Sequence, residues 1–343
     1  MQTEHVTAVG DARDLALADD STDLVVTSPP YPMIELWDDL FADLDPAIGD
    51  HLDAGDGDAA FEAMHAALAP AWDELARVLK PGGIACINVG DATRSVDDEF
   101  QQYPNHAVVI EAMRERGFRS LPDILWRKPV NRRTKFMGSG MVPTNAYTTL
   151  EHEYILVFRN GSTREFPPGE RRRYESAYFW EERNEWFSDL WTLTGTDQAL
   201  DGEGRDRSGA FPLQLPLRLV TMYSVYGDHV LDPFWGTGTT TLAAMLAGRN
   251  SVGFDRDPAL LTGFDDHIAD LEKRSRSYVE GRLDRHREFV AEREAAGKDL
   301  GYDAEQYDFP VVTNQERRIR LYAVENVRPT VSGYAVEHAP FEP

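Results

Sequence analysis

The 343-residue sequence contains one cysteine, Cys86, and only five lysines. A single cysteine excludes an intramolecular disulfide and a multi-cysteine zinc site, and we predict no metal site. Cys86 lies in the apolar run 84–87, which is typical of a packed core. No apolar run approaches the ~20 residues that cross a bilayer, and no basic-then-apolar signal pattern opens the chain. The composition therefore predicts a cytoplasmic protein without a membrane partner.

Basic residues are scarce as well: 35 lysines and arginines stand against 59 acidic residues, which gives a net charge of −24. A nucleic-acid-binding protein is ordinarily basic, so this balance counts against such a partner. An acid-rich, lysine-poor composition is, however, typical of proteins from a salt-saturated cytoplasm, where surface carboxylates aid solubility. At molar salt the Debye length falls to about 3 Å, and repulsion of a polyanion by the whole protein largely disappears. We therefore expect a halophilic source, and local charge must decide the partner.

Short β-rich runs alternate with helical stretches along most of the chain, a pattern that predicts an α/β fold. In such a sheet, ligands bind at the carboxyl ends of the strands. Strands are predicted at 5–9, 24–26, 84–89, 124–126, 154–158, 230–232 and 251–254, and helices at 61–79, 217–226 and 240–247, the last ending at Gly248.

Three regions depart from this alternation. Residues 38–58 hold eight aspartates and are predicted to form a solvated surface loop. Residues 159–209 are rich in Arg, Glu and Trp but show no clear period. Residues 258–293 predict one highly charged helix, followed by a tail with strand-like runs at 310–312 and 319–324. Because there is no internal repeat and no low-complexity linker, a second independent domain is not indicated.

The segment 232–240, Asp-Pro-Phe-Trp-Gly-Thr-Gly-Thr-Thr, leaves one predicted strand and enters a helix. Its glycines let the backbone approach a ligand, and the helix N-terminus offers free N–H groups. The next strand ends at Asp255, where a carboxylate is placed to accept hydrogen bonds from ribose hydroxyls. The glycine spacing is not G-x-G-x-x-G, and no P-loop lysine follows. A nucleoside-bearing cofactor is therefore predicted here.

A second short string, Thr27-Ser28-Pro29-Pro30-Tyr31, directly follows the predicted strand 24–26. The Ser28 hydroxyl and the Pro29 carbonyl supply two hydrogen-bond acceptors, and the consecutive prolines stiffen the loop. Tyr31 offers an aromatic face on which a base can stack. Ser and Pro are also turn residues, so a strand-ending turn is the alternative interpretation.

Together the two strings resemble the catalytic and cofactor loops of a known family, the β-group DNA amino methyltransferases. In that circularly permuted group the catalytic loop comes first, as it does here. The TSPPY string is typical of its N4-cytosine-specific modification methylases. RNA and protein-glutamine methyltransferases usually carry Asn-Pro-Pro-Tyr with the cofactor loop first, which is the opposite order.

The resemblance implies a Rossmann-like, seven-stranded methyltransferase sheet, S-adenosyl-L-methionine as cofactor and double-stranded DNA as partner. The activity implied is methylation of the exocyclic amino group of a flipped base within a short specific site, cytosine N4 because Ser28 opens the loop. Adenine N6 is the alternative within the family, and an inactive DNA-binding regulator is a rival of another class. The sequence leaves open whether the protein forms a homodimer and whether a restriction endonuclease accompanies it.

The family's functional residues match this chain as follows. The predicted catalytic residues are Ser28, Pro29, Pro30 and Tyr31. The predicted cofactor residues are Asp11, Phe211, Asp232, Pro233, Phe234, Gly236, Gly238, Thr239, Thr240 and Asp255. Segments 80–91 and 152–156 also resemble the family and are interpreted as scaffold, with Asp91 as a further residue that could face the pocket.

Local positive charge lies between the two loops. Segment 126–135 contains five basic residues and no acid, and arginine suits both phosphates and guanine edges. We therefore predict DNA contacts by Arg127, Lys128, Arg132, Arg133 and Lys135. Segment 171–173 is a second basic cluster, and three arginines alone are more often a solvated charged surface. The chain then divides into a catalytic half (1–125), a target-recognition insertion with one sheet strand (126–210), a cofactor half (211–270) and an unassigned helix and tail (271–343).

Overall fold

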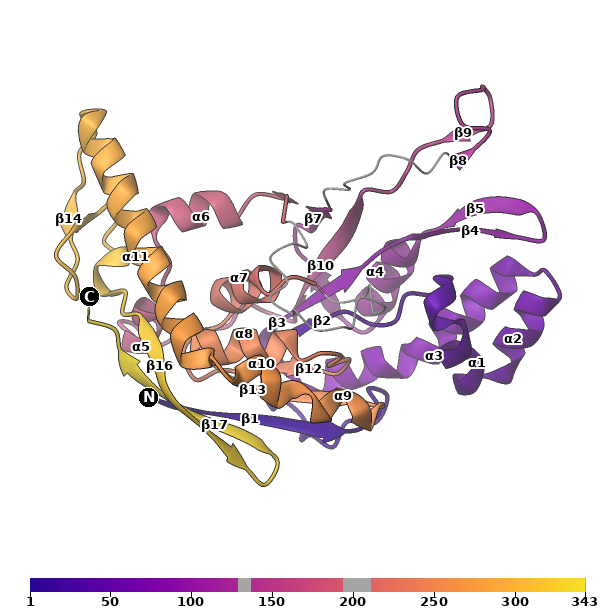
Figure 1. Cartoon of the computed structure of the whole chain (residues 1–343), viewed down its shortest axis with the longest axis horizontal. Helices are drawn as coiled ribbons and strands as arrows, with labels where there is room; N and C mark the ends of the chain where they lie inside the picture. The colour runs from indigo at the N-terminus through magenta and orange to yellow at the C-terminus, as the bar shows by residue number, and fades with distance from the viewer. Residues whose placement is uncertain (129–136, 194–210, 343) are drawn as a thin grey trace.

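The computed structural model describes residues 1–128, 137–193 and 211–342, and a large mixed sheet runs through them (Figure 1). Parallel strands form its centre, and longer segments rather than tight turns connect them, as parallel pairing requires. Their order is β3 (Leu79–Val89), β2 (Thr22–Thr27), β12 (His229–Asp232), β13 (Asn250–Asp255) and β1 (Gln2–Val9). Strands β2 and β12 are therefore neighbours, although they are about two hundred residues apart in the sequence.

Further strands extend both edges of this centre. Beyond β3 lies antiparallel β10 (His152–Asn160), which pairs with β6 (Phe118–Ser120) and β7 (Ile124–Arg127), and β11 (Leu190–Trp191) completes that edge. Beyond β1 lies the hairpin β16 (Tyr322–Thr330) and β17 (Gly333–Pro340). The α/β class is confirmed, but the predicted count of seven strands is wrong, because the described residues alone place eleven strands in this sheet. Segment 126–210 contributes more than the single strand predicted for it.

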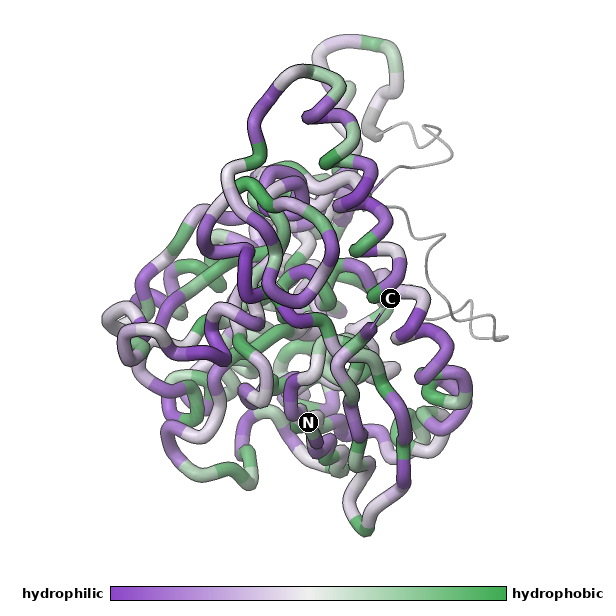
Figure 2. The backbone as a smooth tube through the Cα atoms, turned by 90° about the vertical axis from the view of Figure 1, so that its left-hand side faces the viewer, coloured by the Kyte–Doolittle hydropathy of each residue, from purple (hydrophilic) through white to green (hydrophobic). Residues whose placement is uncertain are grey.

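Alternate residues of the central strands point to opposite faces and join two separate cores. Val26 packs in a cluster with α7 (Gln214–Tyr223), α8 (Thr239–Ala247) and residues of α11 (Leu271–Ala295). Val25 packs in the other cluster, with α3 (Gly57–Val78) and α4 (Asn105–Glu115). Coloured by hydropathy, the backbone carries hydrophobic segments through the middle of the molecule, and hydrophilic segments prevail in its outer turns (Figure 2).

The aspartate-rich segment 38–58 is helical, not the predicted loop. It forms α1 (Asp38–Leu44) and α2 (Pro46–Asp53), and then enters α3. Two of its aspartates act as N-caps: Asp45 accepts from Ala47 N and Asp56 from Ala59 N, both at 3.0 Å. Such caps stabilise a helix start by about 1 kcal/mol. Phe41 and Ile48 are fully buried beneath the charged surface.

The carboxyl-terminal part also differs from its prediction. Segment 258–293 is not one helix but three: α9 (Pro258–Thr262), α10 (Phe264–Ile268) and α11. The tail then supplies β14 (Tyr302–Asp303), β15 (Pro310–Val311) and the β16–β17 hairpin. The hairpin lies beside the amino-terminus, where Met1 N donates to His338 O at 2.8 Å. Within the described ranges, no helix is long and apolar enough to cross a membrane.

Candidate active site

A cavity of about 600 Å³ lies at the carboxyl ends of β2 and β12. Both the TSPPY loop and the DPFWGTGTT loop line this cavity, because the strands that precede them, β2 and β12, are neighbours in the sheet. Of the predicted catalytic and cofactor residues, only Gly238 and Thr240 do not line the cavity. The lining ones are Asp11, Ser28, Pro29, Pro30, Tyr31, Phe211, Asp232, Pro233, Phe234, Gly236, Thr239 and Asp255.

Gly238 and Thr240 do not face the cavity but support the conformation of the 232–240 loop. Gly238 precedes α8 with a φ of +78°, and a Cβ there would lie 2.6 Å from the Phe264 and Trp235 rings. Only glycine suits both that backbone conformation and that contact. Thr240 is buried, and its hydroxyl donates to Val26 O on the neighbouring strand at 3.2 Å. These two residues therefore hold the loop in place.

Asp255 closes the loop from the end of β13. Its Oδ2 accepts from Gly236 N at 2.8 Å, and its Oδ1 accepts from Asp257 N at 2.9 Å. Each carboxylate oxygen has a second lone pair, so both can still accept a hydrogen bond from a ligand in the cavity. The carboxylate is thus held rigidly by backbone donors at the cavity wall.

Asp232 connects the DPFWGTGTT loop to the end of β2. Its Oδ1 accepts from the Thr27 hydroxyl at 2.7 Å, across 205 residues of sequence, and from Phe234 N at 3.2 Å. Burial is the main reason that the pKa of Asp232 is raised to about 6. Its side chain therefore fixes the relative position of the two loops.

The stability of the protein should depend on pH through this residue. The folded protein holds the Asp232 proton more tightly than the unfolded chain, whose pKa is near 3.8. The resulting stability is fully present below about pH 4 and is lost as the pH rises through about 6, up to ~3 kcal/mol. Asp232→Asn should lack this change. Urea unfolding of both proteins at constant salt, at pH 4 and pH 7, measures it, and parallel pH profiles would contradict the assignment.

Asp11 reaches the cavity with its charge already paired. Arg13 donates to both of its carboxylate oxygens, at 3.0 and 2.8 Å, and Arg256 lies 3.7 Å away. The hydrogen bond from Arg13 is the main cause that lowers the pKa of Asp11. Arg13 itself lines the cavity and was not predicted from the sequence.

The TSPPY loop belongs to a hydrogen-bonded network that the sequence did not reveal. Ser28 Oγ lies 2.8 Å from Tyr31 Oη, which donates to Glu153 Oε2 at 3.1 Å. Asn88 Nδ2 donates to both Tyr31 Oη and Glu153 Oε2, each at 2.7 Å. Burial, and then the charge of Glu153, raises the pKa of Tyr31, so its hydroxyl stays protonated. Lys128 forms an ion pair with Glu153.

Glu153 lines the cavity, although segment 152–156 was interpreted as scaffold. Asp91, the further residue expected to face the pocket, does not line the cavity: its carboxylate pairs with His106 Nδ1 at 2.8 Å and accepts from Gln102 Nε2 at 2.7 Å. The outer wall of the cavity is apolar and comes partly from α1. Leu36 and Trp37 precede α1, and Leu40 and Leu44 lie within it. Their helical spacing is the signal that could have found them in the sequence.

The predicted DNA-binding residues are only partly described. Arg127 is half exposed and pairs with Glu151 at 3.0 Å, while Lys128 pairs with Glu153 beside the cavity. Both cations are therefore close to a carboxylate. Arg132, Arg133 and Lys135 lie outside the described residues.

Comparison with known proteins agrees with this geometry. A family model described as DNA methylase matches residues 22–264. The type II methyltransferase M.MthZI of Methanothermobacter thermautotrophicus is 50% identical over 328 residues, 94% of this chain and 91% of the relative. M.MjaI of Methanocaldococcus jannaschii, also a type II methyltransferase, is 46% identical over 79% of this chain and 93% of its own length.

A solved structure extends the likeness to the fold. The crystal structure of TTHA0409 from Thermus thermophilus, complexed with S-adenosyl-L-methionine, is 31% identical and superposes with a TM-score of 0.60. The match covers 78% of this chain and 95% of that one. The family model spans both loops of the cavity and the strands that carry them. This chain therefore belongs to the N6/N4 DNA methylase family.

Proposed function

We propose that this protein is a type II DNA methyltransferase that transfers a methyl group from S-adenosyl-L-methionine to cytosine N4 of a flipped base, within a short specific site in duplex DNA. One observation carries the proposal: a single cavity contains both the TSPPY loop and the DPFWGTGTT loop. A cofactor bound on one loop and a base held by the other would then face each other.

The residues present fit this cofactor. The cavity volume is within the ~300–1,000 Å³ usual for small-molecule sites. Asp255 offers acceptors to the ribose hydroxyls, and the backbone at Gly236 carries no Cβ that would block a close approach. Phe234 and Leu260 provide apolar surface for the adenine ring. The bound cofactor supplies an electrophilic methyl group on a sulfonium.

The other residues act on the base. An exocyclic amino nitrogen is a poor nucleophile, because its lone pair is delocalised into the ring. Ser28 Oγ and the Pro29 carbonyl can accept its two hydrogens and so draw the lone pair out of conjugation. Tyr31, with its hydroxyl anchored by Asn88 and Glu153, presents its ring for stacking. No strong base is required, since the product ammonium is acidic enough to lose its proton.

The choice of base rests on Ser28, because serine at this position accompanies N4-cytosine methylation in the resemblance described above. The test is mass spectrometry of nucleosides after incubating the protein with duplex DNA and labelled cofactor. We expect labelled N4-methylcytosine. Labelled N6-methyladenine would show that the target is adenine and not cytosine. Absence of any label would favour a DNA-binding regulator without activity.

Asp255→Ala should weaken S-adenosylmethionine binding by ~2 kcal/mol, because hydrogen bonds to a charged group are lost. The fold should remain, since the residue lies at a strand end. Calorimetric titration with the cofactor measures the affinity, and circular dichroism controls for folding. An unchanged affinity in a folded variant would rule out the ribose role.

Replacing Arg132 and Arg133 by alanine should weaken DNA binding and leave cofactor binding unchanged. Each lost phosphate contact should make the plot of log affinity against log salt shallower by about 0.9. A lost guanine contact would instead relax sequence preference at one position. A salt titration of both proteins on one duplex distinguishes these cases. If affinity, slope and preference all stay the same, DNA does not bind at segment 126–135.

A further inference from the structure

A second cavity, of about 610 Å³, lies at the opposite end of the sheet from the candidate active site. Gly82 and Ile84 line it from the start of β3, and Arg159 lines it from the end of antiparallel β10, directly opposite Ile84. The remaining walls come from segment 163–183, which includes α5 (Arg171–Glu175), from the end of α7 and from residues 313–316. In Figure 1, α5 lies at the left of the molecule, whereas α1, beside the active site, lies at the right.

The lining is strongly positive, although the whole chain carries a net charge of −24. Four arginines line the cavity against one carboxylate, Glu316. That carboxylate is engaged already, since it accepts from Trp180 N at 2.8 Å and from Thr313 N at 2.7 Å. The cavity therefore has an excess of cations that its own acid does not neutralise.

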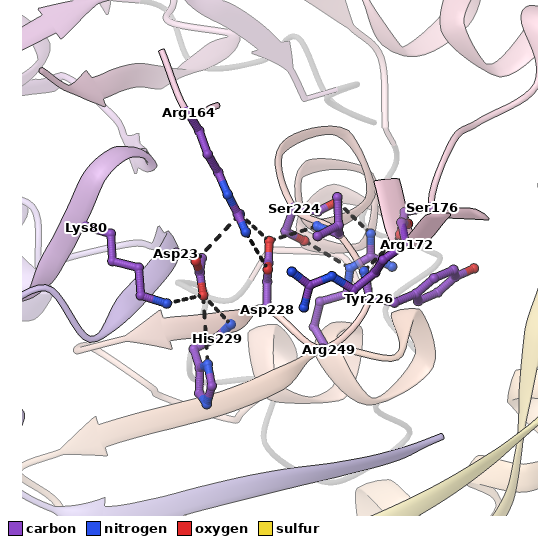
Figure 3. Close-up of polar contacts among 12 residues, drawn as sticks. Asp23, Lys80, Arg164, Arg172, Ser176, Ser224, Tyr226, Asp228, His229 and Arg249 are labelled. Carbon is purple, nitrogen blue, oxygen red and sulfur yellow. Dashed lines mark hydrogen bonds and ion pairs between the residues drawn. The ribbon is translucent and has the colours of Figure 1, made fainter. Parts of the chain in front are cut away.

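One of these four arginines, Arg164, forms ion pairs with carboxylates that do not line the cavity. Arg164 donates two hydrogen bonds to Asp228, at 2.6 and 3.0 Å, and lies 3.5 Å from Asp23, which Lys80 also contacts (Figure 3). The other three differ. Among the described residues, no carboxylate lies within ion-pair distance of Arg159, Arg173 or Arg183.

Local packing positions two of the four arginines, Arg164 and Arg173. The guanidinium groups of Arg164 and Arg173 both lie over the Phe166 ring, with centroid distances of 4.6 and 4.8 Å. Gly82 has a φ of +83°, and a Cβ there would lie 2.6 Å from Arg164 N. The absence of a side chain at Gly82 therefore lets the arginine-bearing segment lie directly against β3.

Aromatic side chains complete the cavity. Tyr174, Tyr178, Trp180 and Tyr223 line it, and within the described residues the hydroxyls of the three tyrosines make no hydrogen bond. Burial raises the pKa of Tyr178 and of Tyr223, so their hydroxyls remain donors. A heterocyclic base can stack on these flat rings, and the planar guanidinium group of arginine can donate two hydrogen bonds to phosphate oxygens. Both features line the same cavity.

We propose that this cavity binds a nucleoside phosphate, with the phosphates on Arg159, Arg173 and Arg183 and the base against the aromatic wall. The site does not depend on the proposed methyl transfer. Duplex DNA does not fit it as well, because the target base must enter at the carboxyl ends of the strands, whereas this cavity opens at their amino ends.

Calorimetry of the full-length protein tests the proposal, with GDP as the probe because adenine nucleotides would compete for the cofactor cavity. The salt is set to a level at which circular dichroism shows the protein to be folded. We expect one GDP to bind per chain, with guanosine and inorganic pyrophosphate each at least ~10-fold weaker, a difference of about 1.4 kcal/mol. Equal binding of pyrophosphate would overturn the role of the base, and equal binding of guanosine would overturn the role of the phosphates.

Single variants locate the site. Arg173→Gln and Arg183→Gln should each weaken GDP binding at least ~5-fold, the loss of one charge-assisted hydrogen bond. Arg171→Gln is the matched control, since Arg171 pairs with Glu175 at 2.7 Å and does not line the cavity. Asp255→Ala should leave GDP affinity unchanged, and a loss there would place GDP in the cofactor cavity. Weaker duplex binding by the Arg173 and Arg183 variants, with GDP binding intact, would assign this surface to DNA and overturn the proposal.

Discussion

Ser28→Ala is expected to lower kcat at least ~10²-fold and to leave the affinity for S-adenosylmethionine nearly unchanged. In the proposed function the hydroxyl is one of two acceptors for the target amino group, whereas Asp255 offers the acceptors for the cofactor's ribose. Ser28 Oγ lies 2.8 Å from Tyr31 Oη, so the network holds the hydroxyl at the cavity wall. Single-turnover methylation of a duplex by the variant and the parent protein measures the effect.

Two further variants make that result specific. Ser21→Ala removes a buried hydroxyl directly before β2, whose oxygen has no hydrogen-bond partner among the described residues. It should leave kcat unchanged. Tyr31→Phe keeps the stacking ring but removes the contact to Ser28, so its kcat should fall less than that of Ser28→Ala. Near-normal turnover in Ser28→Ala would mean that Ser28 serves only as a turn residue, and it would weaken the cytosine assignment.

The sequence located both loops because each motif is local. A strand, its last residues and the following turn lie within ten positions, so the string around Ser28 and the string around Gly236 each specify their own geometry. Their proximity followed from one general rule, that parallel strands present their carboxyl ends at the same edge of a sheet. The glycine stop at Gly248, with a φ of +70°, was predicted for the same local reason.

Glu153 was missed because its position depends on pairing between distant strands. In the register of β10, Tyr154 is opposite Val89 on one side, and Glu153 is opposite Trp126 on the other. That register brings Glu153 to Asn88 and Lys128, and a shift by one residue would turn it to the other face. Neither strand's own sequence specifies this register. The sequence therefore identified segment 152–156 without revealing which of its side chains faces the cavity.

The prediction of a loop at 38–58 was wrong for a different reason. Composition averages over positions, whereas Asp45 and Asp56 act at single backbone N–H groups as helix caps. The burial of Phe41 decides the helix, and that burial comes from packing against another element. Tertiary packing overrides local propensity here. Tertiary pairing also explains the strands of the tail. There β17 of the β16–β17 hairpin pairs with β1, from the other end of the chain, and so extends the sheet.

Gly253→Ala should destabilise the fold by ~3 kcal/mol, the upper end of the usual cost of overpacking. Gly253 lies in β13, and a Cβ there would be 2.0 Å from Trp235 Cδ1. The Trp235 indole is buried and donates from Nε1 to Thr241 Oγ1 at 2.8 Å, so it has no free space into which to move. Because Trp235 belongs to the cofactor loop, cofactor affinity should fall at least ~10-fold as well.

The comparison for this change is Gly263→Ala, since a Cβ at Gly263 would meet nothing within 4 Å and its φ is −90°. Urea unfolding should show a loss for Gly253→Ala but not for Gly263→Ala, and calorimetry should show the same contrast in cofactor affinity. Combining Gly253→Ala with Trp235→Ala should cost less than the sum of the two single changes, because removal of the indole relieves the clash. If the two costs simply add, the contact between Gly253 and Trp235 does not set the position of the cofactor loop.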